Sequence, residues 1–515
     1  MNNRAFGFKK ISLRALIFLC IFSFVGTEFS GLAVASPAAE VLRQKPKKSK
    51  SGTKKSKATA SSKKKKSKKN TASKSRSKKS RNTARVSASK KGVKRVLSPK
   101  IELYQTLVDT VLSPGVEYKH LIIGREKHSV HVVKANITNP AYKFEILKGA
   151  GRVDGLERVK DIVARYDSTT NSNVLTAVNA NFWSTRALPI GPVVIDGEVV
   201  QMGSHKQWSS AFFTPSGQLF IDSFKLKGSI VDKRGVKYPV VSVNYRSDST
   251  GLVLYNAFAG DTIPYVSPLS VDKQLEDMEK NRVETDGDST EAPLSLDYLR
   301  NLLLAERRSK NIESQMTKVQ LRYLRSPVVN GKVACQVLAV SAGDVKMPVR
   351  GMILSLGKNS TMTIPNEGDT LYMEFTTNYY KNIEFTNAVS GTPRIVRRGV
   401  AGHEAYSEGS TAKRFIMHNL ARTAIGTDET GENIYLVSID ATGRQEECVG
   451  ATLSQTAQIM EYLGCYDAMN LDGGGSTTMA IGQDIVTHRN IISMPRKVSV
   501  AVAITRKAYM RRGDL

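Results

Sequence analysis

A long run of positive charge limits which part of this chain can fold. Residues 43–100 contain 20 lysines and 5 arginines but no acidic or aromatic residue. A segment with so little apolar surface cannot offset the entropy lost on ordering its backbone, so we expect residues 36–100 to form a disordered basic arm. The fold is therefore confined to residues 101–515, which carry only +3 of the formal net charge of +30.

This distribution of charge bears on the partners of the chain. Specific nucleic-acid recognition needs cations clustered on a folded surface, and a nearly neutral folded part does not favour it. Residues 43–100 of the arm are suited to binding an anionic polymer of a cell envelope or a lipid surface. A solvated spacer is the alternative for the same residues.

Residues 1–35 have the composition of a secretory signal peptide. Four cations precede an apolar stretch at residues 15–25, and small residues follow at Ala33 and Ala35. The apolar stretch is shorter than the roughly 20 residues that cross a bilayer, although a retained signal anchor is the alternative. We expect cleavage after Ala35 and a secreted or periplasmic protein, with retention at the cell envelope left open.

The pattern from residue 101 onward predicts an α+β fold of β-rich mixed sheets. Helical spacing of apolar residues occurs near residues 156–166, 296–303 and 452–463. The acidic stretch at about 266–318 predicts a helical insertion at the surface. Short apolar runs are joined by residue pairs that tolerate the positive φ of tight hairpin turns, namely Asp196-Gly197, Ser216-Gly217 and Asn330-Gly331.

The clearest local pattern is a C-terminal βαβ unit. Apolar strands are expected at residues 434–439 and 468–471, on either side of a helix that begins with a capping box. Such a unit favours parallel strands that end at the same edge of the sheet. Asp440 and Asp472 follow the two strands, so their carboxylates should lie about 5 Å apart on adjacent strands or about 10 Å apart across an intervening strand. Alternatively, each aspartate caps a turn.

The βαβ unit carries an Asp-Gly-Gly-Gly-Ser loop directly after its second strand. Three consecutive glycines let the backbone approach a ligand closely and point N–H groups at an anion. The loop lacks the lysine of a Walker motif, and a tight turn without a ligand is the alternative. The Ser476 and Thr477 hydroxyls could bind phosphate or sugar oxygens, or satisfy the local backbone instead.

Three motifs together are more specific than each alone. They are VNANFW at residues 178–183, RTAIG at residues 422–426 and NLDGGGS at residues 470–476. In this combination the chain resembles the phosphodiester glycosidase family, over about residues 114–505 without residues 266–318. The resemblance implies hydrolysis of a sugar that is linked through its anomeric carbon to a phosphodiester.

Such a reaction needs a carboxylate at the anomeric carbon and donors for the phosphate. We therefore predict Asp472, Asp440 and Arg422 as catalytic residues, since a guanidinium matches phosphate in a bidentate manner. The family usually has Asp-Gly-Arg after the first strand, whereas this chain has two more residues before Arg444, and the extra length can shift that side chain. The predicted substrate-binding residues are Asn181, Arg444, Gly473, Gly474, Gly475, Ser476 and Thr477.

No cofactor and no metal site are predicted. His403 and His418 lie near Arg422 in the sequence but lack the spacing of zinc ligands. Calcium or magnesium could bind oxygen atoms of Asp440 and Asp472, although nothing in the sequence requires either ion.

The sequence thus predicts an exported glycosidase that acts on a phosphorylated glycan of a cell envelope or extracellular matrix. A non-catalytic envelope protein that binds a phosphoglycan or another polyanion is the alternative. The oligomeric state cannot be deduced from the sequence.

Overall fold

The apolar runs form strands that pair mostly with partners far away in the sequence. The computed structural model describes residues 101–246, 249–283, 295–441, 448–487 and 495–507. The predicted signal peptide, the predicted basic arm and Arg444 lie outside the described residues. The β-rich α+β class that the sequence predicts is confirmed.

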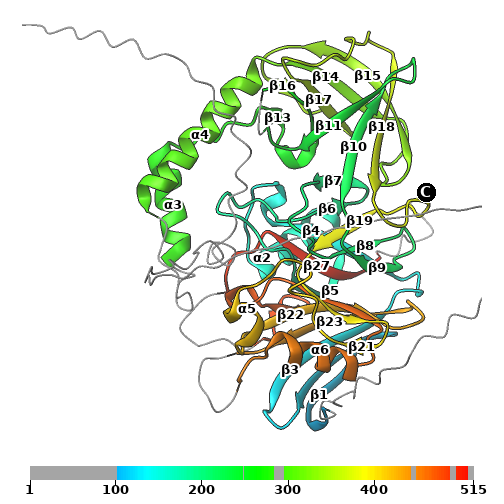
Figure 1. Cartoon of the computed structure of the whole chain (residues 1–515), viewed down its shortest axis with the longest axis vertical. Helices are drawn as coiled ribbons and strands as arrows, with labels where there is room; N and C mark the ends of the chain where they lie inside the picture. The colour runs from blue at the N-terminus through cyan, green and yellow to red at the C-terminus, as the bar shows by residue number, and fades with distance from the viewer. Residues whose placement is uncertain (1–100, 247–248, 284–294, 442–447, 488–494, 508–515) are drawn as a thin grey trace, which may run out of the picture. The chain divides into compact units, whose positions relative to one another are not determined.

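An eight-stranded sheet joins segments from both ends of the described chain (Figure 1). Strand β3 pairs antiparallel with β23, so an N-terminal hairpin lies beside a C-terminal strand. The strand order is β1 (Leu103–Ser113), β2 (Val116–Ile123), β3 (His128–Asn136), β23 (Asn433–Ile439), β22 (Arg422–Thr427), β24 (Asp467–Asn470), β20 (Arg394–Arg397) and β21 (Val400–Ala401).

Two five-stranded sheets share an apolar core with the eight-stranded sheet. The first has the order β26 (Asp484–Ile485), β25 (Met479–Ile481), β5 (Asn173–Asn179), β27 (Val500–Arg506) and β4 (Tyr142–Lys148). The second has the order β7 (Glu198–Gln201), β6 (Val193–Ile195), β19 (Asn387–Ser390), β8 (Ser210–Phe213) and β9 (Leu219–Asp222).

Two helices cover the outer faces of the layers that meet in this core. Helix α2 (Val159–Thr170) buries Ile162 and Val163 against the sheet that contains β5 and β27. Helix α6 (Leu453–Tyr462) buries Ala457 and Met460 against the eight-stranded sheet. The predicted capping box is confirmed, since the Thr452 side chain accepts a hydrogen bond from the Gln455 N–H and the Gln455 side chain bonds back.

The strands on either side of α6 are those that the sequence predicts, but they are not neighbours. Strand β22 lies between β23 and β24 and pairs antiparallel with both. Strands β23 and β24 are therefore parallel to each other. Of the two arrangements considered from the sequence, adjacent strands or strands separated by another, the structure has the second.

The middle of the chain forms a closed barrel, which the sequence patterns did not reveal. The barrel shares a second apolar core with the sheet of β6 and β8. Strands β11 and β12 pair in parallel, whereas its other pairs are antiparallel. The order is β10 (Leu226–Val231), β11 (Lys237–Val243), β12 (Leu252–Tyr255), β17 (Gly351–Leu356), β14 (Thr317–Tyr323), β15 (Lys332–Ser341) and β18 (Thr370–Thr377).

Two helices occupy the segment in which the sequence predicts an insertion. Helices α3 (Val271–Val283) and α4 (Leu296–Ser314) pack on each other through Leu275 and Leu299. The Ser295 side chain accepts a hydrogen bond from the Tyr298 N–H and caps α4. The remaining short elements are η2 (Gly149–Gly151), η3 (Ala257–Ala259), β13 (Thr262–Ile263), β16 (Val345–Lys346), α5 (Lys413–Met417) and η5 (Gly474–Ser476).

Among the described residues, none of the helices has both the length and the apolar character needed to cross a membrane.

Candidate active site

Arg422 and Asp472 lie at one edge of neighbouring strands. Arg422 is the first residue of β22, and Asp472 follows β24 by two residues. Ala424 pairs with Asn470 in the antiparallel register of these strands. The same register, continued by two residues, places Asp472 opposite Arg422. Two of the three predicted catalytic residues therefore come together from segments 50 residues apart in the sequence.

The glycine loop packs closely against the start of β22. The Gly474 N–H donates to the Ala421 carbonyl at 2.8 Å. A Cβ atom at Gly473 would lie 2.8 Å from the same carbonyl oxygen, and Gly474 has a φ of +58°. Because side chains are disfavoured at both positions, the glycines set the path of the loop around the Asp472 carboxyl.

Asn179, at the end of β5, fixes the backbone on both sides of Asp472. Its Nδ2 donates to the Asp472 carbonyl at 2.6 Å, and its Oδ1 accepts from Thr423 Oγ1 at 2.7 Å and from the Thr478 N–H at 3.0 Å. The Asp472 N–H donates in turn to the Ala180 carbonyl at 2.8 Å. The sequence analysis missed this role of Asn179, although a polar residue at the end of an apolar strand is a signal that could have found it.

The Asp472 carboxyl has an environment suited to proton transfer near neutral pH. Burial raises its pKa from 3.8 to about 6, although the Ser476 side chain, the Arg496 guanidinium and the Gly473 N–H act in the opposite direction. Arg496 also lies against the loop, because a Cβ atom at Gly475 would be 3.0 Å from its Nη2. Arg496 is a second residue that the sequence analysis did not single out.

The guanidinium of Arg422 is buried and binds backbone carbonyls. Its Nε donates to Ala451 at 2.8 Å, and its Nη2 donates to Phe415 at 2.7 Å and to His418 at 3.2 Å. Burial lowers the pKa of Arg422 to about 9, which still leaves the group charged at neutral pH. Because Nε and Nη2 already donate to these carbonyls, they are not available to bind a phosphate in the bidentate manner that the sequence analysis expects. Nη1 donates to no carbonyl of the described residues.

A group of aromatic side chains extends from Arg422 to Phe182, the residue after Asn181. The Arg422 guanidinium lies 5.3 Å from the centre of the Phe415 ring. Phe415 packs edge-on against Phe182, with the two ring centres 6.1 Å apart. The ring centres of Phe182 and Trp208 are 5.4 Å apart, and those of Trp208 and His205 are 4.6 Å apart. Trp208 Nε1 and His205 Nε2 are buried without a hydrogen-bond partner among the described residues. Sequence patterns gave no sign of this aromatic group.

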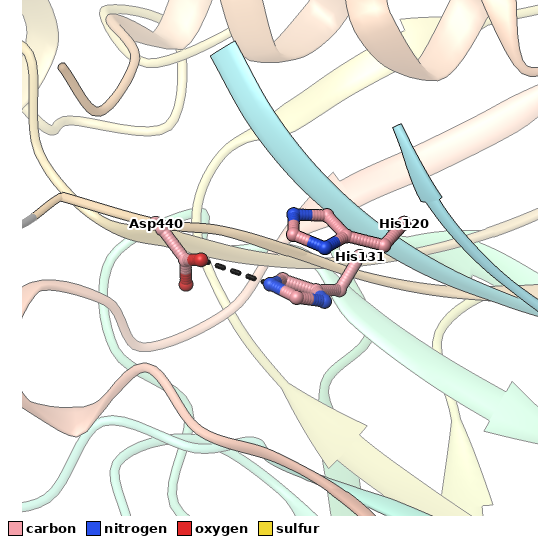
Figure 2. A group of neighbouring side chains, drawn as sticks. All are labelled: His120, His131 and Asp440. Carbon is pink, nitrogen blue, oxygen red and sulfur yellow. Dashed lines mark hydrogen bonds and ion pairs between the residues drawn. The ribbon is translucent and has the colours of Figure 1, made fainter. Parts of the chain in front are cut away.

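Asp440 lies in a different set of contacts, shown in Figure 2. Its carboxylate accepts from Ser129 Oγ at 3.1 Å and lies 2.9 Å from His131 Nε2. Only 1% of Asp440 and of His131 is exposed. Both of these partners belong to β3, whereas the Asp472 carboxyl lies among the glycine loop and Arg496, so the two carboxylates stand in separate environments.

Asn181, a predicted substrate-binding residue, supports the backbone instead. Asn181 Nδ2 donates to the Ile190 carbonyl at 3.1 Å, and Asn181 Oδ1 accepts from the Ser390 N–H at 3.2 Å. Ser476 and Thr477 are buried in the turn that follows Asp472. The His403 pKa is lowered, first by burial and then by the charge of Arg422, which places this histidine on the arginine's side of the site.

Comparison with known proteins gives this geometry a family context. Residues 328–505 match the phosphodiester glycosidase family. The match includes Arg422, Asp440, Asp472 and Arg496, and it confirms the resemblance seen in the sequence over this segment. Asn181 and the aromatic residues Phe182 and Trp208 precede it.

The curated relatives that this chain matches share one name. N-acetylglucosamine-1-phosphodiester alpha-N-acetylglucosaminidase of Bos taurus is 29% identical over 134 residues, which are 23% of this chain and 25% of the relative. The Homo sapiens protein of the same name is 30% identical over 135 residues, with the same coverage. The chain thus spans about a quarter of the length of the curated relatives it matches.

A solved structure extends the likeness of fold beyond this segment. A hypothetical protein from Synechocystis has a TM-score of 0.52 and 20% sequence identity, and the alignment covers 78% of this chain and 64% of that chain. At this identity the similarity concerns the fold alone.

Proposed function

We propose that this protein is an exported glycosidase that hydrolyses sugar-1-phosphodiester linkages in a cell-envelope or extracellular phosphoglycan. The observation that carries the proposal is the Asp472 carboxyl, with its pKa raised to about 6, held beside a glycine loop and Arg496 within the segment that matches the family. Export rests on the composition of residues 1–35.

In the proposed reaction, the bond between the anomeric carbon and the phosphate oxygen breaks. The oxygen leaves with the bonding electrons as part of a phosphate monoester, and water supplies the hydroxyl group that remains on the sugar. Phosphate is a good leaving group, so the reaction depends less on a proton donor than ordinary glycoside hydrolysis does. Asp472 acts in its ionised form, either as the nucleophile or as the base that takes a proton from water.

The phosphate needs donors that keep their charge in a partly buried site. Arg496 lies against Gly475, and Arg422 places its guanidinium at the same edge of the sheet. We assign Arg496 to direct phosphate contact, because the Gly473 and Gly474 N–H groups already donate to Asp472 Oδ1 and to the Ala421 carbonyl. Arg422 has bonded Nε and Nη2 atoms, so its part is to position residues 415–418 and Ala451 and to add positive potential.

The sugar needs apolar surface together with a few hydrogen bonds. Phe182 and Trp208 supply aromatic faces and edges, and Trp208 Nε1 is a buried donor without a partner among the described residues. We assign these residues to the sugar-binding side of the site. Asp440 takes a positioning role, because its backbone carbonyl accepts from the Gly450 N–H at 3.0 Å, next to the Ala451 carbonyl that binds Arg422.

The test is hydrolysis of a panel of glycosyl-1-phosphodiesters by the purified mature protein. Hydrolysis is measured as the release of the phosphate monoester. Asp472→Asn should abolish turnover while keeping the fold. Asp484→Asn is the matched control, because Asp484 is exposed on β26, at the edge of the sheet that contains β25 and β5. Turnover by the folded Asp472→Asn variant at the wild-type rate would refute the assignment. Binding of the panel without any hydrolysis would favour the alternative, a non-catalytic phosphoglycan-binding protein.

A further inference from the structure

A second cluster of ligand-type side chains lies away from the glycine loop. His120 on β2 pairs with His131 on β3, and the two rings are stacked with their centres 3.9 Å apart. Asp440 follows β23, the strand on the other side of β3. Figure 2 shows the Asp440 carboxylate pointing at the His131 ring, beside which the His120 ring lies.

The ligand atoms of these three residues are close enough to share one ion. One nitrogen of each histidine and one Asp440 oxygen all lie within 4.8 Å of one another. Zinc bonds of about 2.0–2.2 Å require ligand atoms roughly 3–4 Å apart in a tetrahedral site. His131 Nε2 and Asp440 Oδ2 are already 2.9 Å apart, so the His120 ring, which is stacked on the His131 ring, has to turn and approach for its nitrogen to share the ion.

The surroundings of the cluster are those of a metal site with oriented ligands. Tyr118 Oη lies 2.9 Å from His131 Nδ1 and so can hold the proton on that nitrogen, which leaves the Nε2 lone pair directed at the cluster. Ser129 Oγ lies 2.9 Å from His120 Nε2 and 3.1 Å from Asp440 Oδ2, on the remaining side. His120, His131 and Asp440 are all buried, at 8%, 1% and 1% exposure.

We propose that His120, His131 and Asp440 bind a divalent transition-metal ion of the zinc class. Two imidazole nitrogens and one carboxylate suit zinc and its neighbours rather than calcium or magnesium, which prefer all-oxygen sites. Ser129 closes the fourth side of the site.

The bound ion would tie the β2–β3 hairpin to the end of β23. His131 and Asp440 are 309 positions apart in the sequence, and the ion would join them at the point where β23 leaves the sheet. The Asp440 carbonyl fixes Gly450, whose neighbour Ala451 binds Arg422. The site is therefore structural and supports the active-site edge without contacting the substrate.

The test is metal binding by the full chain, purified without a histidine tag and stripped with a chelator. Elemental analysis and calorimetric titration with Zn²⁺ should give one tightly bound ion per chain. Co²⁺ in the same site should show the intense visible absorption of a four-coordinate ion with nitrogen and oxygen ligands. Failure to bind either ion, a weak six-coordinate spectrum, or a strong thiolate-to-cobalt band would each overturn the proposal.

Variants then locate the ion. His131→Gln and His120→Gln should each weaken Zn²⁺ binding by at least about 100-fold, and Tyr118→Phe, which keeps the packing, by about 10- to 100-fold. His418→Gln is the matched control, since His418 is exposed. Wild-type affinity in His131→Gln would overturn the assignment. Should the histidine variants fail to fold, the Tyr118→Phe affinity decides: an unchanged value contradicts the site, and a weakened value supports it.

Discussion

Asp472→Asn should make the protein more stable near neutral pH while removing its activity. The Asp472 carboxyl is held in a setting that disfavours its charge, since burial raises its pKa from 3.8 to about 6. An asparagine has the same shape, is neutral at every pH, and retains an oxygen that can accept the Gly473 N–H, which donates to Asp472 Oδ1 at 2.9 Å. The substitution thus removes the charge and little else.

The pH dependence follows from the direction of the shift. Below pH 3.8 the carboxyl is protonated in both the folded and the unfolded chain, and its charge has no effect on stability. As the pH rises toward about 6, the unfolded chain ionises first, so the wild type loses free energy of unfolding. The shift of roughly two units, at about 1.4 kcal/mol each, makes the loss about 2–3 kcal/mol above the folded pKa.

The assay is denaturant unfolding of the wild type and of Asp472→Asn at about pH 4 and about pH 8. Relative to the wild type, Asp472→Asn should gain about 2 kcal/mol between these two conditions. Other effects of the substitution do not depend on pH and cancel in this difference. Asp484→Asn should show no such gain. A stability difference between Asp472→Asn and the wild type that is equal at both pH values would refute the reasoning.

The remaining predictions concern the same site and the arm. In the pH profile of kcat/KM, the acidic limb should have its midpoint near pH 6, with activity rising as Asp472 ionises. Arg496→Gln should move that limb to higher pH, because it removes a positive charge that lowers the Asp472 pKa. A limb that stays in place in Arg496→Gln would contradict this. Arg422→Lys should lower both kcat and the unfolding midpoint, since a lysine cannot reproduce the bonds to the three backbone carbonyls; unchanged kinetics would refute it. Attachment of residues 43–100 to an anionic polymer should weaken steeply between about 0.1 M and 1 M salt, as the Debye length falls from about 10 Å to about 3 Å, so pull-down that persists in molar salt would exclude this mechanism.

Local sequence signals predicted the elements around Asp472 correctly. Thr452 and Gln455 form the capping box, and Gly464, with its φ of +93°, lies just past the end of α6. These features depend on residues a few positions apart, so they can be read without knowledge of the tertiary structure. The placement of Arg422 beside Asp472 needed one further fact, the pairing of β22 with β24, which no local signal contains.

The barrel shows the same limit on a larger scale. Its strands are joined by ordinary turn signals such as Asn330-Gly331, but its closure depends on the pairing of β10 with β18, whose residues are far apart in the chain. Strand pairing at such distances is fixed by packing of the whole core rather than by the propensity of any one segment. A sequence analysis can therefore name the strands without knowing the sheet that they form.

Asp440 shows how the same limit affects the assignment of chemistry. Its position after an apolar strand is equivalent to that of Asp472, and from sequence alone both qualify as catalytic carboxylates. The neighbouring segments decide between them. Strand β3 brings His131 to within 2.9 Å of Asp440, whereas the glycine loop leaves Asp472 beside Arg496. Two equivalent sequence positions thus acquire different chemistry from their neighbours across the sheet, one suited to holding an ion and the other to attack at an anomeric carbon.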